Sequence, residues 1–199
     1  MLLKLLLCLF APVLALASQL SFEPESALPP APRLEWIFTA TFQVRPNVAP
    51  LRPGPMGIRL DIAILGGEVK GRHGLTGRVR PVGSDWVRVD PVSGNGLADA
   101  RWSIVLPSVV HGKRMETEVF VRTLGPSLPG TLSKAHLHMR FEAPAGEFGW
   151  LNWICAIGIL EILNPDNKTA QTTVINVYHL EYEHGPSHYG PEETLGMPE

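Results

Sequence analysis

Cysteine is scarce in this 199-residue sequence, which contains only Cys8 and Cys155. Cys8 lies in an N-terminal apolar run that we interpret below as a removable leader. The mature chain then retains one cysteine and cannot form an intramolecular disulfide, so its stability must come from a hydrophobic core. Cys155 stands in the apolar stretch 153–157, without a neighbouring cation to activate a thiol. We expect it to be a small buried hydrophobe rather than a nucleophile.

Long apolar runs and clusters of one charge sign are also missing. The longest apolar run, Leu5–Ala17, has about 13 residues, whereas a helix needs about 20 to span a bilayer. Basic and acidic residues nearly balance, at 17 Lys+Arg against 19 Asp+Glu, and they form no basic stripe. We therefore expect no membrane span after leader removal and no nucleic-acid partner.

Signatures of several common enzyme classes are absent from the sequence. It has no Gly-x-Ser-x-Gly nucleophile elbow, no glycine-rich phosphate loop and no dinucleotide fingerprint. We therefore expect neither a nicotinamide nor a flavin cofactor, and we assign no cofactor. The expected partner is a small-molecule ligand or substrate, and the sequence leaves open whether the chain forms a homo-oligomer.

The N-terminus has the form of a secretory signal peptide. Lys4 precedes the apolar run, which ends in the small-x-small sequence Ala15-Leu-Ala17. This pattern predicts a signal peptide over residues 1–17, cleaved between Ala17 and Ser18, rather than a membrane anchor. We expect a protein that is secreted or resident in the lumen of the secretory pathway. The sequon Asn167-Lys-Thr169, in a turn-like stretch, accordingly predicts glycosylation at Asn167.

Short β-strands account for most of the remaining chain. Gly or Pro stands in nearly every gap between apolar segments, and no helical periodicity persists over about a dozen positions. The predicted strands are residues 34–44, 58–65, 75–82, 85–89, 98–106, 115–123, 136–143, 150–163 and 172–182. This spacing indicates one all-β domain over 34–182, either a sandwich or a barrel. We expect residues 18–33 to be an extended, proline-rich leader and residues 183–199 a disordered tail.

A family resemblance favours the barrel. The blocks that carry it are Gly66-Gly67, Gly71, Leu75-Thr-Gly77-Arg-Val79, Gly83, Asp85-Trp86, Asp99-Ala-Arg101-Trp102, Arg140-Phe-Glu142, Trp150-Leu-Asn152 and Val174-Ile-Asn-Val-Tyr178. In order and spacing they resemble the family called domain of unknown function 3237. The resemblance implies a single antiparallel, up-and-down, lipocalin-like (calycin-like) barrel of about eight to ten strands. Most members have no assigned activity, and the signal peptide is an addition to the family pattern.

One predicted strand carries polar side chains on a single face. His136, His138, Arg140 and Glu142 alternate with apolar residues, so this face looks either to solvent or into a barrel lumen. His136, His138 and Glu142 also satisfy the first metal motif of the cupins, whereas the family usually has Thr or Pro in place of the two histidines. Because no second cupin block follows, we keep a metal site at these residues only as an alternative.

Several charged residues are candidates for catalysis. Asp85, beside Trp86, is either a turn cap or a desolvated general acid or base. Asp99 and Arg101 share a strand face, which Arg122, Arg140 and Glu142 join if these strands line one lumen. Such a group is either a salt-bridge network or a pocket that grips a carboxylate or enolate oxygen. We assign catalytic roles to Asp85, Arg101, Arg140 and Glu142, and ligand binding to Trp86, Asp99, Arg122, Trp150 and Asn152.

These residues support three hypotheses about function. The first is an isomerase, cyclase or dehydratase that acts on a small, largely apolar, oxygenated molecule without a redox cofactor, in the biosynthesis of secondary metabolites. In it, Arg101 and Arg140 hold developing negative charge while Asp85 or Glu142 moves a proton. The second is a non-catalytic secreted carrier of a small apolar ligand. The third is a metal-dependent, cupin-like enzyme that uses the His-x-His strand.

Overall fold

The computed structural model describes residues 31–46 and 53–181. The chain divides into two units, Met1–Ala31 and Pro32–Glu199, and all described residues except Ala31 belong to the second. The predicted signal peptide, its cleavage site between Ala17 and Ser18, most of the proline-rich leader and the tail 183–199 lie outside the described residues. No helix in the described part of the chain is long and apolar enough to cross a membrane.

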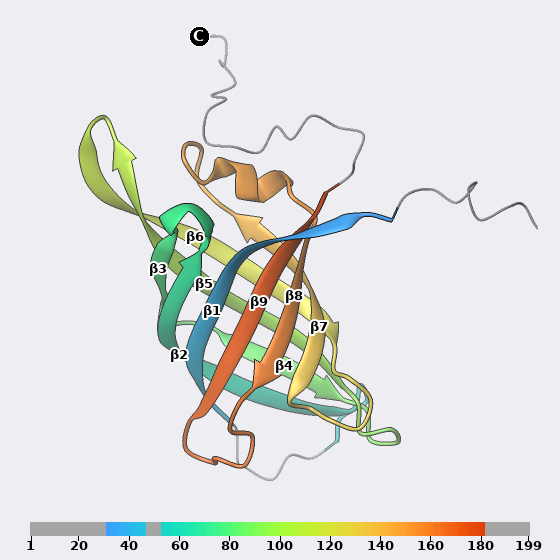
Figure 1. Ribbon diagram of the computed structural model, residues 1–199. Coiled ribbons are helices and arrows are strands. Elements are labelled where there is room, and N and C mark those ends of the chain that lie inside the picture. The colour runs from blue at the N-terminus through green and yellow to red at the C-terminus, as the bar shows by residue number, and fades with distance from the viewer. Residues whose placement is uncertain (1–30, 47–52, 182–199) are drawn as a thin grey trace, which may run out of the picture. The chain divides into compact units, whose positions relative to one another are not determined.

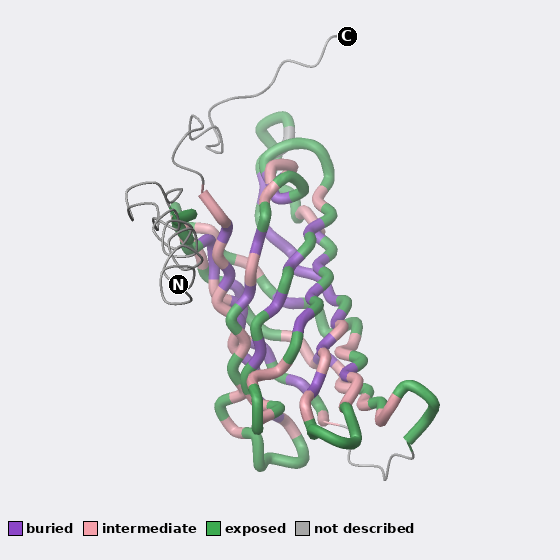
Figure 2. Tube along the Cα trace, turned by 90° about the vertical axis from the view of Figure 1, so that its right-hand side faces the viewer, coloured by how far each residue is buried: buried purple, intermediate pink, exposed green. Residues whose placement is uncertain are grey.

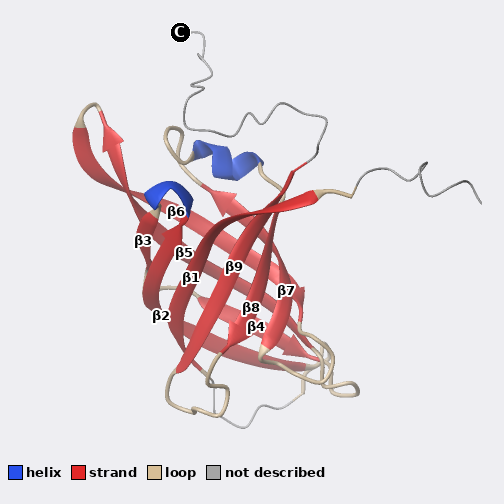
Figure 3. Ribbon diagram, viewed as in Figure 1, coloured by secondary structure: helices blue, strands red, loops and turns tan. Residues whose placement is uncertain are grey.

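The second unit is built almost entirely from β-strands (Figures 1 and 3). The strands are β1 (Arg33–Arg45), β2 (Ile58–Gly71), β3 (Thr76–Val79), β4 (Ser84–Val89), β5 (Gly96–Val110), β6 (Lys113–Pro126), β7 (Lys134–Glu142), β8 (Ala156–Ile162) and β9 (Gln171–Glu181). Two short 3-10 turns, η2 (Arg72–Gly74) and η3 (Gly149–Trp153), accompany them. The all-β prediction is confirmed.

The strands form one antiparallel sheet that closes into a barrel. Their order is β1-β9-β8-β7-β6-β5-β3-β2-β4, and additional β1–β2 and β4–β5 pairings complete the ring. The short strands β3 and β4 both lie between β2 and β5, so they occupy one position of the barrel in succession. Apart from β3 and β4, which both pair with β2 and β5, each strand pairs with its neighbours in sequence, and β9 returns to β1. The predicted up-and-down, lipocalin-like barrel is therefore confirmed.

Buried and exposed residues alternate along the strands (Figure 2), and the buried side chains form the hydrophobic core. On β7, the apolar residues Leu137, Met139 and Phe141 are buried, while the polar residues between them are exposed. The rings of Phe38 and Phe141 meet edge to face at a centroid distance of 6.0 Å. This packing stabilises the barrel without a disulfide, because contiguous apolar burial supplies the main favourable free energy.

Three local expectations were wrong. Gly66 and Gly67 do not end a strand: β2 continues to Gly71, and Leu65 is the extra residue of a β-bulge opposite β1. Gly66 adopts a φ of 99°, which favours glycine and lets the strand bend there. The predicted strand 150–163 begins instead with η3, and only its second half forms β8. Cys155, in the connection between them, is exposed rather than buried.

Candidate functional site

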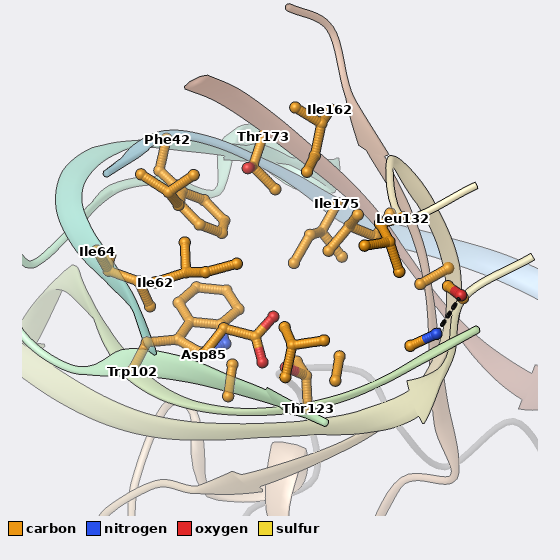
Figure 4. A pocket seen from close by; sticks show the side chains of 18 residues that line it. Phe42, Ile62, Ile64, Asp85, Trp102, Thr123, Leu132, Ile162, Thr173 and Ile175 are labelled. Carbon is orange, nitrogen blue, oxygen red and sulfur yellow. Dashed lines mark hydrogen bonds between the residues drawn. The ribbon is translucent and has the colours of Figure 1, made fainter. Parts of the chain in front are cut away.

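A cavity of about 60 Å³ lies inside the barrel, and we call it the Asp85 cavity (Figure 4). Most of its lining is aliphatic or aromatic. The side chains that line it are Phe42, Val44, Ile62, Ile64, Asp85, Val87, Ala98, Ala100, Trp102, Thr123, Ser127, Leu132, Ala135, Leu160, Ile162, Thr173 and Ile175, together with Gly96. Because one water needs roughly 10–15 Å³ measured in this way, the cavity holds a few waters or one compact ligand group.

Asp85 is the only ionisable side chain in this lining. Along β4 the inward residues alternate with exposed ones, so Asp85 shares the inner face with the buried Val87, whereas Trp86 between them points outward. The backbone N–H of Asp99, on the neighbouring β5, donates to Oδ1 of Asp85 at 3.0 Å. The barrel wall thus fixes the carboxyl at the edge of an apolar space.

The environment of Asp85 shifts its acidity strongly. Burial raises the pKa of the carboxyl from 3.8 to about 6. The hydrogen bond from the Asp99 backbone N–H lowers this pKa, and the nearby charge of the Asp99 side chain raises it, but neither outweighs desolvation. A carboxyl with this pKa exchanges protons readily near neutral pH, which is the property that a general acid or base requires.

Trp102 provides a hydrogen-bond donor in the same cavity. Its side chain is 4% exposed and packs against Phe42 at a ring-centroid distance of 5.3 Å. The indole Nε1 is buried without a hydrogen-bond partner. Leaving such a donor unpaired costs about 1–3 kcal/mol, so a group that accepts its hydrogen bond would recover stability. Figure 4 shows this nitrogen and the Asp85 carboxylate facing the same space.

Three hydroxyl residues complete the polar part of the lining: Thr123, Ser127 and Thr173. Ser127 Oγ accepts the backbone N–H of Gly96 at 2.9 Å and thereby joins β5 to the segment after β6 (dashed in Figure 4). Thr123 and Thr173 are almost completely buried, on β6 and β9. The cavity therefore combines one proton-transfer group, one strong donor and weaker hydroxyl groups in apolar surroundings. This set suits a compact oxygenated molecule.

The arginines expected in the lumen lie instead on the outer wall. Arg101, Arg122 and Arg140 are exposed, and the strand register places Arg101 opposite Arg122 and Arg122 opposite Arg140. Arg122 also pairs with Asp99, with Nε and Oδ1 3.2 Å apart. The inner positions of these strands are taken by the buried neighbours of each arginine, all of which are apolar except Thr123. The salt-bridge alternative thus describes the Asp99–Arg122 pair, and neither Arg101 nor Arg140 reaches the Asp85 cavity.

The polar face of β7 also points outward. His136, His138 and Glu142 are exposed, and Glu142 lines a surface hollow together with Arg101, Phe120 and Arg122. Within residues 31–46 and 53–181, the group of three or more potential metal ligands that come close together is Glu35, His179 and Glu181. The alternative His136, His138 and Glu142 set is thus not assembled into one site.

The remaining predicted residues are distributed over the surface. Trp86 is 60% exposed on the outer wall. Asn152, in η3, holds the backbone of Ala143 through two hydrogen bonds, in which Oδ1 accepts the N–H at 2.7 Å and Nδ2 donates to the carbonyl at 2.9 Å. Trp150 lines a separate cavity with Glu35 and His179. Asn167 is exposed in the loop between β8 and β9. Of the predicted catalytic and ligand-binding residues, only Asp85 lies in the barrel interior.

Trp102, Phe42 and Thr123 are lining residues that sequence reasoning missed as site residues. A signal for Trp102 was present, because Ala98, Ala100 and Trp102 alternate with the polar residues Asp99 and Arg101. This alternation assigns the apolar set to the interior and the charged set to the outside. Two small residues next to a large one on an inner face also leave room for a cavity.

Comparisons with known proteins agree with this architecture. A conserved protein of unknown function from Rhodopseudomonas palustris aligns with 23% identity and a TM-score of 0.59, covering 76% of this chain and 99% of its own. A protein with unknown function from Clostridium acetobutylicum aligns with 19% identity and a TM-score of 0.60 at the same coverage. No curated protein matches. Residues 32–180 match the family described as a protein of unknown function (DUF3237), and the chain belongs to this family.

Proposed function

We propose that the protein is a proton-transfer isomerase that acts on a compact, largely apolar carbonyl compound in the Asp85 cavity, without a redox cofactor. The observation that supports this proposal is the pairing of Asp85, whose pKa is raised to about 6, with the unpartnered indole N–H of Trp102 in one apolar cavity. Acid–base groups with shifted pKa values beside an unused donor are typical of sites that stabilise charge formed during a reaction.

The chemistry follows from the two side chains. Ionised Asp85 removes a proton from the carbon next to the carbonyl group, and the electron pair of that C–H bond moves toward the carbonyl oxygen. The Trp102 N–H donates a hydrogen bond to this oxygen as it gains negative charge. In a β,γ-unsaturated substrate the resulting dienolate carries negative charge at its γ-carbon as well, and neutral Asp85 then returns the proton to that carbon, which moves the C=C bond into conjugation with the carbonyl group. No electrons leave the substrate, so the step balances without an oxidant or a second substrate.

The size of the cavity limits the substrate. At about 60 Å³ the space admits the reacting end of a molecule, and a larger substrate requires the lining side chains to move. Leu132 is 45% exposed and follows the turn after β6. Because it has few buried contacts to lose, it is the lining side chain that we expect to move aside. The substrate class that fits is a small cyclic or branched carbonyl compound.

The proposal is tested by exchange of carbon-bound hydrogen for deuterium in heavy water, followed by NMR over a panel of small cyclic and branched ketones. We expect Asp85→Asn to slow exchange by about 10²- to 10⁴-fold, the usual contribution of a general base. Trp102→Phe should slow it by about 10- to 100-fold, since it removes one donor to the developing oxyanion. The outer-wall variant His138→Ala is the matched control and should exchange at the normal rate.

A carrier of the same kind of ligand is the competing function. It requires the apolar cavity but no proton transfer, so ligands would bind to the protein without any exchange and with equal affinity on both sides of pH 6. Exchange that persists at the normal rate in Asp85→Asn would contradict the catalytic role of Asp85.

A further inference from the structure

A second cluster of polar side chains lies outside the Asp85 cavity. It consists of Glu35 on β1 with His179 and Glu181 on β9, and we call it the Glu35 cluster. Along β9, His179 lies four positions from Ile175, which lines the Asp85 cavity. At about 3.3 Å per residue this separation is about 13 Å along the strand. The cavity that Glu35 and His179 line shares no residue with the Asp85 cavity, so the two sites are distinct.

A β-bulge in β1 builds the Glu35 cluster. Phe38 pairs with Val177, Trp36 pairs with Tyr178 and Glu35 pairs with His179, so Ile37 is an extra residue on β1. Regular alternation from the buried Phe38 would turn Trp36 inward and Glu35 outward. The extra residue reverses this order, and Glu35 shares the inner face with His179. Bulges commonly re-aim a side chain in this way beside functional sites.

The three side chains converge on one nitrogen. His179 Nε2 lies 2.9 Å from Oε2 of Glu35 and 3.6 Å from Oε1 of Glu181. All three ligand atoms lie within 4.8 Å of one another, and His179 is only 8% exposed. Two atoms bound to one zinc ion at about 2.1 Å, in tetrahedral geometry, are about 3.4 Å apart. The spacing of these atoms therefore fits one ion after small side-chain rotations.

The charge balance of the Glu35 cluster also favours a cation. Arg72 pairs with Glu35 through Oε1, which leaves Oε2 of Glu35 and the carboxylate of Glu181 both directed at the imidazole of His179. Two carboxylates in a partly buried position destabilise each other unless positive charge lies between them. One guanidinium compensates one carboxylate, and a divalent ion would compensate the other.

We propose that Glu35, His179 and Glu181 form a binding site for a single divalent transition-metal ion, of which Zn²⁺ is the best fit. One imidazole nitrogen and two carboxylate oxygens are ligands that zinc accepts, and three protein ligands leave one tetrahedral position open. Glu35 and His179 also line a cavity of about 300 Å³, whose walls include Trp36, Phe148 and Trp150. Because two of the three ligands line this cavity, a water or a small ligand could reach a bound ion from it.

The test measures Zn²⁺ binding to the purified full mature chain by isothermal titration calorimetry, after treatment with a chelator. We expect one equivalent to bind with a dissociation constant of about 1 μM or below. The Glu35→Gln/Glu181→Gln double variant should bind at least about 100-fold more weakly, because loss of a direct ligand exceeds the roughly 10- to 100-fold effect of an outer-shell partner. His179→Gln should do the same. Circular dichroism checks that each variant folds.

Three controls identify the site. The His136→Ala/His138→Ala variant removes the exposed histidines of β7, and His184→Ala/His188→Ala removes two that lie outside the described residues. Asp85→Asn alters the barrel cavity only. All three should bind Zn²⁺ as tightly as the unmodified chain. Absence of binding, equal binding by the Glu35→Gln/Glu181→Gln variant, or loss of binding in either histidine double variant would each overturn the proposal.

Discussion

Asp85 destabilises the folded protein at neutral pH. Its pKa rises from 3.8 to about 6 on folding, so the folded state binds the proton more tightly than the unfolded state does. The contribution of Asp85 to stability is therefore most favourable below pH 3.8, becomes less favourable as the pH rises toward 6, and then levels off. The full cost above pH 6 is about 3 kcal/mol, of which about 1 kcal/mol is already present near pH 4.5.

The Asp85→Asn variant tests this cost directly. Because the amide cannot ionise, we expect the stability of the variant relative to the unmodified chain to increase by about 2 kcal/mol between about pH 4.5 and 7.5. Urea unfolding at both pH values gives the two differences. Asp90→Asn is the matched control: hydrogen bonds from Val92 and Ser93 lower the pKa of Asp90, so it titrates below this pH range. A constant difference for Asp85→Asn would contradict the raised pKa.

Desolvation of Asp85 was one of two alternatives that the sequence offered, but the neighbouring indole N–H of Trp102 could not be anticipated. The sequence neighbour of Asp85, Trp86, points outward, and burial on the inner face of β4 raises the pKa of the carboxyl instead. The unpaired N–H of Trp102 depends on what neighbouring strands place around it, and no local pattern encodes that absence of a partner. The Glu35 cluster is similar, since it requires a bulge that shifts β1 against β9 by one residue.

Element positions were predictable because turns are marked locally. Gly and Pro bound most strands, and nine segments were expected where the structure has β1 to β9. The face that each polar set occupies was harder to predict. His136, His138, Arg140 and Glu142 alternate with apolar residues in the same way whether they face solvent or a lumen. The buried side chains decide the question: Leu137, Met139 and Phe141 are too bulky and apolar to form the outer face.

Close approach between β6 and β7 depends on Gly125. A Cβ atom at this position would overlap the backbone carbonyl of His136. Backbone atoms in a barrel wall cannot move aside singly, so we expect Gly125→Ala to destabilise the protein by about 2–3 kcal/mol. Gly149→Ala is the matched control, because its Cβ would lie 3.4 Å from the Pro144 carbonyl oxygen, an ordinary contact. Thermal unfolding of both variants gives the two losses of stability. An equal loss in Gly125→Ala and Gly149→Ala would contradict the special requirement for glycine at position 125.

The whole molecule is expected to travel through the secretory pathway, and the β8–β9 loop offers a way to test this. Asn167 is exposed there, and its Oδ1 accepts the backbone N–H groups of Thr169 at 2.9 Å and Ala170 at 3.1 Å. Replacing Asn167 would remove both the sequon and these turn hydrogen bonds. Thr169→Ala removes only the sequon, because the backbone N–H of residue 169 is retained.

Expression of the full sequence in eukaryotic cells should therefore release a chain that begins at Ser18 and carries one N-linked glycan. Treatment with a glycan-removing amidase should lower its mass by the mass of that glycan, whereas Thr169→Ala should be secreted without the glycan and unfold at the same temperature. Retention of the intact leader, with Asn167 unmodified, would contradict secretion and place the barrel in another compartment.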